Sequence, residues 1–292
     1  MKSPLLFILP IILFAGCNRF SNKDEEKNHP KRIISISKQY SEFIFALGAQ
    51  QNLVAVDISS TYPEAVKKLK TVGYHRALSI ESILANKPDL ILEDGPESMG
   101  PEHVVRQLEN LKIPMMSFEI KASNIDSTKL LLNEMGAYFK KEKAADSLGK
   151  KLDADMKTAL EKAKTYKDKP RVLIIHYGQA NNVFFIINNK TGAGNMVKWA
   201  GGDMIQAPKG VRQLSAEVVA KSNPDVIILT DFGYDKLGSA EKIGELPGVS
   251  STSAFKNKRV YRFEEHDLLY LGPRTGENVL KLQQLIHRNG QI

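Results

Sequence analysis

The chain has 292 residues, of which 42% are hydrophobic and 25% are charged, and its formal net charge is +8. This length and apolar content suit one large or two ordinary globular domains, and they exclude a disordered or collagen-like chain. The single cysteine excludes an intrachain disulfide and, by itself, a cysteine-rich zinc or iron–sulfur site. Because the basic excess is modest and spread out, we expect a solvated lysine-rich surface and no nucleic-acid partner.

The first 16 residues have the pattern of an export signal. Lys2 is followed by an apolar run over residues 5–14, which is half the ~20 residues that span a bilayer. The run is followed by Ala15, Gly16 and Cys17, and together with Phe14 these residues resemble the bacterial lipobox, although leucine is usual where Phe14 stands. We expect cleavage after residue 16, a lipid on Cys17 and a flexible polar tether over residues 17–31. An ordinary cleavable signal with an accidental cysteine is the alternative.

Residues 32–126 alternate between short apolar strands and helical stretches. Strands are predicted at the apolar segments that lie between turn residues, namely 33–36, 53–56, 90–92 and 115–118. A helix is predicted from a serine cap at Ser41 to a terminal glycine at Gly48. Alternation of this kind is typical of an α/β lobe with a mostly parallel sheet.

Residues 127–169 are helical in pattern and rich in lysine. Apolar residues recur at steps of three or four over residues 145–163, which predicts one apolar stripe and one charged face. Pro170 ends this stretch, and a second α/β lobe is predicted over residues 170–292. Its last helix is expected over residues 275–287.

Two segments of the chain repeat each other. Leu78-Ser79-Ile80-Glu81 and Leu214-Ser215-Ala216-Glu217 are each followed by Pro-Asp and an apolar strand. Seven residues separate glutamate from proline in both (88 − 81 and 224 − 217), and Arg76 and Arg212 each precede the leucine by two places. The repeat predicts an α/β protein with two similar Rossmann-like lobes, joined by a long rigid helical spine, with a ligand cleft between them.

These blocks together resemble the class III periplasmic binding proteins, which deliver cobalamin, iron-siderophores or haem to ABC importers. The resemblance runs from about Arg32 to the end of the chain and includes RIISIS, WAGGD and ELPG. It implies a non-catalytic monomer, exported and lipid-anchored to a bacterial membrane, that docks on a permease dimer. Glu81 and Glu217 match the family's docking glutamates. The alternative is that each carboxylate only stabilises the first turn of its helix.

Within that family, residues 60–63 (STYP) and 72–79 (VGYHRALS) most resemble the haem-binding branch. In that branch a tyrosine or histidine of this loop binds ferric iron and an arginine supports it. The resemblance implies Tyr74 as the iron ligand, Arg76 beside it and His75 as the possible substitute. Ferric iron accepts a phenolate ligand well. The alternative is that Tyr74 is a packed loop aromatic.

His176 and Tyr177 end the first strand of the second lobe, where open α/β sheets bind ligands. We expect one of them as a second haem ligand, unless a backbone carbonyl satisfies His176. Arg274 is a candidate for a haem propionate, because a helix start with an arginine suits an anion. Arg212 is a similar candidate in the second lobe. Pairing of Arg274 with a carboxylate of the protein is an equal alternative.

The sequence is compatible with other functions. No GxSxG, HExxH or Walker motif is present, so we expect neither an enzyme nor a catalytic cofactor. The same scaffold carries ferric siderophores or cobalamin in other members of the family. A zinc or manganese importer protein would use His75, His176 and a carboxylate. A passive surface adhesin or assembly lipoprotein is the last alternative.

Overall fold

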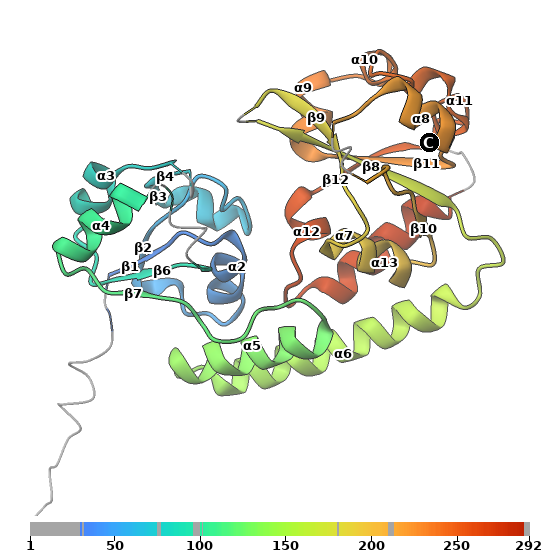
Figure 1. The fold of residues 1–292 in the computed structure, drawn as a ribbon. Coiled ribbons are helices and arrows are strands. Elements are labelled where there is room, and N and C mark those ends of the chain that lie inside the picture. Colours follow the sequence, from blue (N-terminus) through green and yellow to red (C-terminus); the bar gives the residue numbers. More distant parts are fainter. Residues whose placement is uncertain are drawn as a thin grey trace, which may run out of the picture. The chain divides into compact units, whose positions relative to one another are not determined.

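The computed structural model describes residues 30, 32–74, 77–95, 100, 102–179, 181–209 and 213–288. Every helix and strand below belongs to one compact unit, residues 31–292 (Figure 1). The expected export signal and nearly all of the tether lie outside the described residues. So do four predicted site residues: Cys17, His75, Arg76 and Arg212.

The first lobe contains a five-stranded sheet in the order β3-β2-β1-β6-β7. All four pairings are parallel. The strands are β1 (Ile33–Ser35), β2 (Leu53–Val56), β3 (Lys70–Thr71), β6 (Leu90–Leu92) and β7 (Met115–Met116). A separate antiparallel hairpin is formed by β4 (Gly73–Tyr74) and β5 (Ala77–Leu78).

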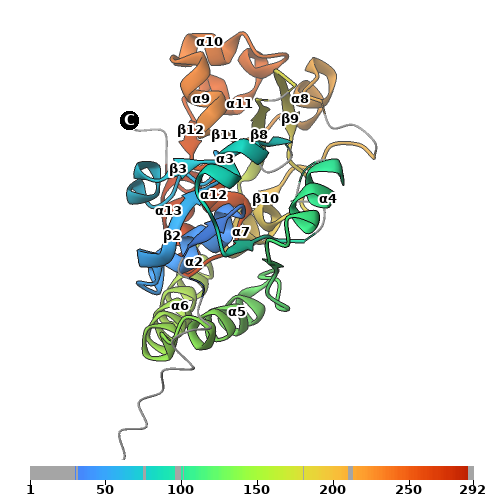
Figure 2. The same ribbon diagram turned by 90° about the vertical axis from the view of Figure 1, so that its left-hand side faces the viewer.

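The helices of this lobe start where side chains can cap them. The helix α2 (Lys38–Ala46) is capped by Ser37, whose hydroxyl accepts from the Tyr40 amide at 3.2 Å. The predicted cap at Ser41 is therefore wrong: Ser41 lies inside the helix and donates to the Ser37 carbonyl. The other helical segments are η1 (Gln50–Asn52), η2 (Glu64–Lys68), α3 (Ile80–Ala85) and α4 (Glu102–Asn110). Figure 2 shows α3 beside α4.

Two helices follow the first lobe, α5 (Ile125–Tyr138) and α6 (Glu142–Ala163). The apolar stripe of α6 is buried as its periodicity predicts. Ala145, near the start of α6, packs into the core of the first lobe. Leu152, Met156 and Ala159 pack into the core of the second lobe. One helix therefore contributes side chains to both cores.

The second lobe contains a sheet in the order β10-β8-β11-β12, with β9 added antiparallel to β8. Its strands are β8 (Arg171–Gly178), β9 (Val183–Ile186), β10 (Asp203–Met204), β11 (Val226–Thr230) and β12 (Val260–Phe263). Its helices are α7 (Gly192–Trp199), α8 (Ala216–Ser222), α9 (Asp231–Leu237), α10 (Ala240–Gly244), η4 (Val249–Ser251), α11 (Ser253–Lys256), α12 (Glu265–Leu269) and α13 (Thr275–Ile286). In the part of the chain that the structure describes, no helix is long and apolar enough to cross a membrane.

Candidate functional site

The repeated sequence blocks form the same local structure in both lobes. Ser79 caps α3 and accepts from the Ser82 amide at 3.1 Å, and Ser215 caps α8 and accepts from the Val218 amide at 3.4 Å. Glu81 and Glu217 then occupy equivalent places in the first turn of each helix. Both side chains are exposed. The repeat thus presents one accessible carboxylate on each lobe.

Tyr74 ends the first strand of the small hairpin. Gly73 before it has φ +96°, and a Cβ there would lie 2.8 Å from the Ala77 carbonyl oxygen, so this position requires glycine. The Tyr74 side chain is 38% exposed. The Ile58 amide donates to the Gly73 carbonyl at 2.9 Å, which places the loop after β2 beside the hairpin. Ile58 is itself 60% exposed, so the hairpin and this loop present apolar surface to solvent.

His176 lies at the carboxyl end of β8 and is half-buried. Its Nδ1 is 3.1 Å from the hydroxyl of Thr230 at the end of β11. Burial, together with the charge of Lys38, lowers the pKa of His176 and outweighs the opposing effect of Glu265. The imidazole is therefore neutral at pH 7. No hydrogen bond to its Nε2 is found among the described residues. In the tautomer whose Nδ1 donates to the Thr230 hydroxyl, Nε2 carries the lone pair that a metal ligand needs.

Tyr177 points to the other face of the same strand. Successive strand residues alternate between the two faces of the sheet. Ile174 packs in one core of the second lobe and Ile175 in the other, so His176 lies on the face of Ile174 and Tyr177 on that of Ile175. The Tyr177 hydroxyl donates to Asn182 Oδ1 at 2.5 Å and accepts from Lys236 Nζ at 2.6 Å. The structure therefore does not bring Tyr177 to the side of the sheet that His176 occupies.

Arg274 is held by carboxylates of the protein. Its Nε donates to Glu42 Oε1 at 2.9 Å and its Nη2 donates to Asp267 Oδ1 at 2.6 Å. Its guanidinium carbon lies 3.5 Å from the centre of the Tyr62 ring. The structural pairing that the sequence left open is present, and a propionate contact by Arg274 would compete with it.

Sequence reasoning missed Lys38, Glu265 and Tyr270. Lys38 Nζ lies 2.5 Å from Glu265 Oε2 and 4.4 Å from the centre of the Tyr270 ring. Burial raises the pKa of Tyr270, and Tyr74 is close enough to add to that effect. Lys38 directly follows the cap after the central strand β1. The rule that ligands bind beyond strand ends could therefore have identified it.

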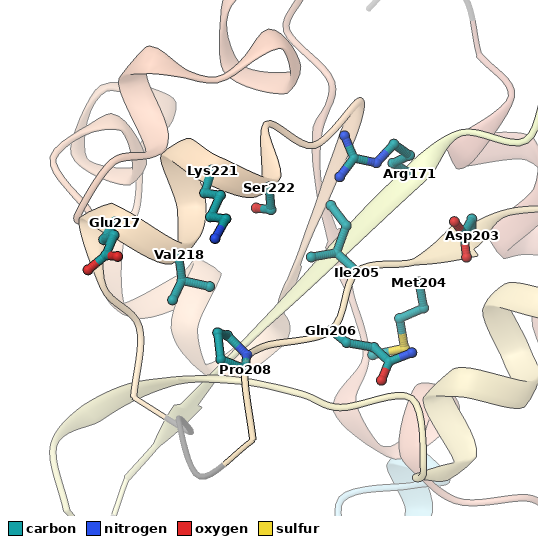
Figure 3. Close-up of a pocket in the computed structure, with 10 residues that line it drawn as sticks. All are labelled: Arg171, Asp203, Met204, Ile205, Gln206, Pro208, Glu217, Val218, Lys221 and Ser222. Carbon is teal, nitrogen blue, oxygen red and sulfur yellow. The ribbon is translucent and has the colours of Figure 1, made fainter.

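Three cavities of the second lobe are lined by neither Tyr74 nor His176. A cavity of about 400 Å³ lies beside Glu217, as Figure 3 shows. Its lining consists of Arg171, Asp203, Met204, Ile205, Gln206, Pro208, Glu217, Val218, Lys221 and Ser222. Two others, of about 380 and 540 Å³, are lined by residues around Lys169. Within the described residues, no three His, Cys, Asp or Glu side chains are grouped as a metal ion would require.

A family model for periplasmic binding proteins matches residues 33–266. The chain therefore belongs to the periplasmic binding protein family, and it is a non-catalytic, substrate-binding protein of the kind that serves ABC importers. An uncharacterized ABC transporter substrate-binding lipoprotein of Bacillus subtilis, YvrC, is 28% identical over 91% of this chain and 83% of that protein. The vitamin B12-binding protein of Pectobacterium atrosepticum is 29% identical over 68% of this chain and 71% of its own length.

Solved structures with the same fold include haem-binding proteins. The periplasmic heme-binding protein RhuT of Roseiflexus, in its apo form, has a TM-score of 0.79 and is 29% identical. That match covers 89% of this chain and 99% of RhuT. BhuT in complex with two haems has a TM-score of 0.75 and is 28% identical, with coverage of 88% and 97%. These matches confirm the predicted fold of two α/β lobes.

Proposed function

We propose that this protein binds haem between its two lobes and delivers it to an ABC-transporter permease. Two solved structures of the same fold, RhuT and BhuT, are named haem-binding proteins. The observation that carries the proposal is the exposure of Tyr74, which is 38%. Tyr74 lies in a hairpin whose backbone conformation requires glycine at position 73. A tyrosine that is exposed to this extent can be reached by a ligand from solvent.

Tyr74 is proposed as the ligand of the ferric iron. A free tyrosine titrates near 10, so a phenolate at neutral pH costs about 4 kcal/mol. Bonding to ferric iron offsets this cost, because the metal is a strong local charge that favours the anion. The exposed apolar side chain of Ile58 beside the hairpin suits a face of the porphyrin. Arg76 is proposed to support the phenolate, and His75 is the possible substitute for Tyr74 as the ligand.

His176 is proposed as the second iron ligand, from the opposite lobe. Its neutral imidazole, oriented through Nδ1 by Thr230, leaves Nε2 for the metal. Tyr177, the other candidate for this role, would have to leave its contacts with Asn182 and Lys236 to reach the iron. Arg212 and Arg274 remain the candidates for the propionates.

Delivery is proposed to use the repeated glutamates. Glu81 and Glu217 are exposed at equivalent places on the two lobes, which suits a partner with two-fold symmetry. Export and a lipid on Cys17 would keep the protein at the membrane that holds the permease. The lipoprotein of Bacillus subtilis that matches this chain supports this localisation.

Cobalamin is the second candidate cargo, with ferric siderophores as a third. The vitamin B12-binding proteins of Pectobacterium atrosepticum and Yersinia pestis are both 29% identical to this chain. Cobalamin already holds its own metal ligands, so on this alternative the hydroxyl of Tyr74 would not matter for binding.

The test is an absorbance titration with haemin and, in parallel, with cyanocobalamin. For haemin, we expect a new Soret band and a phenolate-to-iron charge-transfer band in the wild type. Tyr74→Phe should lose the charge-transfer band and weaken haemin binding about 100-fold or more. Substitution of residues that only support a metal ligand already weakens metal affinity by about 10- to 100-fold, and Tyr74 is proposed as a ligand itself. Tyr138→Phe, a change in α5 away from the site, is the control. Tight cyanocobalamin binding without haemin binding would replace the proposal by the second candidate.

A further inference from the structure

A buried polar cluster fastens the two lobes to each other. We call it the inter-lobe clasp, and it joins the first turns of α2 to the segment from α12 to the start of α13. Its members from the first lobe are Lys38, Gln39 and Glu42, and its members from the second lobe are Glu265, His266, Leu271 and Arg274. All of these side chains are buried except that of Arg274, which is 17% exposed.

Glu42 is the centre of the clasp. Its Oε2 lies 2.5 Å from His266 Nε2 and its Oε1 accepts from Arg274 Nε at 2.9 Å. Burial alone would raise the pKa of Glu42, but His266 and Arg274 hold it below its usual value, so the group is a carboxylate. A Cβ on Gly272 would lie 2.9 Å from Glu42 Oε2, so the backbone of the second lobe packs directly on this side chain.

Two further contacts extend the clasp along α2. Lys38 Nζ lies 2.5 Å from Glu265 Oε2, with both side chains 10% exposed. The Gln39 amide nitrogen donates to the Leu271 carbonyl at 2.6 Å. A buried charged group is stable only when an oppositely charged or hydrogen-bonding partner is close. Because these partners lie on different lobes, they meet only when the lobes have one particular arrangement. An apolar contact of the same area would tolerate sliding.

The clasp also reaches both proposed iron ligands. The His266 ring stacks on Tyr62 at 6.1 Å and on Tyr270 at 5.9 Å between ring centres, and Tyr270 lies near Tyr74. The Glu265 amide donates to Asp231 at 2.8 Å, and the neighbouring Thr230 hydroxyl lies 3.1 Å from His176 Nδ1. The clasp is therefore connected to the surroundings of His176 through Glu265, and its stacked rings end at Tyr270.

We propose that Glu42 is a positioning residue of the cargo site: by fastening α2 to the α12–α13 segment, it sets the spacing at which Tyr74 and His176 reach the same iron. This inference rests on the proposed haem function for its cargo, but the fastening of the lobes does not. Glu42→Gln keeps the size of the side chain, removes its charge and replaces one of the two acceptor oxygens by an NH2 group, so Arg274 and His266 no longer share a carboxylate.

The first test needs no cargo. Spin labels at Lys68→Cys and Lys256→Cys, two exposed positions on the two lobes, report the inter-lobe distance in a chain that also carries Cys17→Ser. We expect one narrow distance distribution in this background and a broadened or shifted one when Glu42→Gln is added. Glu102→Gln, which breaks an exposed pair with Arg106, is the control and should change nothing. A narrow, unshifted distribution in Glu42→Gln would overturn the inference.

The second test uses haemin. Glu42→Gln should keep the charge-transfer band of Tyr74 and acquire the electron paramagnetic resonance spectrum of His176→Ala, because the second ligand no longer reaches the iron. Glu42→Asp, which restores the charge, should recover part of the wild-type signal. Leu131→Ala, in the core of the first lobe, should lower the melting temperature without changing the spectrum. A wild-type spectrum in Glu42→Gln would overturn the positioning role. A wild-type protein that does not bind haemin refutes the proposed cargo. In that case the spin-label distances alone test whether Glu42 fixes the arrangement of the two lobes.

Discussion

At the scale of single residues, the sharpest distinction is between His176 and Tyr177. The two are adjacent in β8, and the sequence favoured His176 as the iron ligand with Tyr177 as the alternative. In the structure, Tyr177 is tied to Asn182 and Lys236, while His176 is oriented by Thr230 and keeps Nε2 without a hydrogen bond among the described residues. The position at a strand end predicts that a residue lies near the ligand site. The alternation of side chains along the strand then decides which of two neighbouring residues can face the ligand.

We therefore expect opposite results from the two substitutions. Tyr177→Phe should leave the haemin spectrum unchanged and lower the free energy of unfolding by about 1 to 2 kcal/mol, because the hydroxyl loses its contacts with Asn182 and Lys236. His176→Ala should change the coordination spectrum and have less effect on stability. Absorbance titration and chemical denaturation measure both quantities. A lost iron ligand in Tyr177→Phe would show that the two roles are assigned the wrong way round.

Asp231, the first residue of α9, gives a prediction about pH. Burial and the nearby carboxylates of Glu264 and Glu265 raise the pKa of Asp231 to about 6, although the Glu265 amide donates to it at 2.8 Å. In the unfolded chain the pKa of an aspartate is about its ordinary value of 3.8. Between these values the folded protein binds a proton that the unfolded chain does not, so this group favours folding as the pH falls through 6.

Asp231→Asn should therefore stabilise the protein at neutral pH. Its amide oxygen still accepts from Glu265, and the buried charge is gone. We expect a gain of about 1 to 2 kcal/mol at pH 7.5 and no gain at pH 4, measured by urea denaturation at both values. Asp146→Asn, at an exposed position, is the control. An equal effect of Asp231→Asn at both pH values would contradict this account.

At the scale of elements, the contact between α6 and α13 depends on a glycine. A Cβ on Gly276 would lie 2.5 Å from the Cβ of Asp155 and 2.9 Å from the Met156 amide nitrogen, and the latter is backbone that cannot turn aside. The two helices can approach this closely only without a side chain at that position. Gly149, in the middle of α6, has open space around it.

These two glycines predict opposite effects of the same change. Gly276→Ala should lower the free energy of unfolding by about 1 to 3 kcal/mol, because α13 must move away from the spine. Gly149→Ala should raise it by about 0.5 to 1 kcal/mol, since alanine is the better helix former. Thermal unfolding of both variants measures the difference. A neutral Gly276→Ala would show that the helices are not in close contact.

The sequence predicted these elements unevenly. The repeat placed α3, β6, α8 and β11 because each block carries its own cap, turn and apolar run. The start of α2 was misplaced, because Ser37 and Ser41 both lie ahead of the apolar run over residues 43–47 and only the backbone conformation decides which one caps. The apolar stripe of α6 was visible in the sequence, but its division between two cores was not.

At the scale of the whole molecule, the inter-lobe clasp could not be predicted from the sequence. Glu42 and His266 are 224 residues apart, and no periodicity relates them. Local patterns predict helices and strands, whereas pairing across lobes depends on how the complete chain packs. For the same reason the pairing of Lys38 with Glu265 and Tyr270 was missed, although the position of Lys38 beyond a strand end could have marked it. The resemblance to a family pointed to Tyr74 and His176 but could not show how the lobes that carry them are joined.

The two docking glutamates give a prediction for transport. The double variant Glu81→Ala, Glu217→Ala should bind haemin as the wild type does and fail to support uptake through the permease in reconstituted vesicles, because each lobe loses its carboxylate. Each single variant should retain part of the uptake. Glu109→Ala with Glu241→Ala, two exposed glutamates outside the repeat, is the matched control. A double docking variant that lost haemin affinity would place these residues in the cargo site.

The proposed bond between Tyr74 and iron is tested most directly by resonance Raman spectroscopy of the haemin-loaded protein, with excitation in the charge-transfer band. We predict iron–phenolate vibrations in the wild type that survive in His176→Ala and vanish in Tyr74→Phe. Iron–phenolate vibrations that persist in Tyr74→Phe, or their absence from the wild type, would contradict the account.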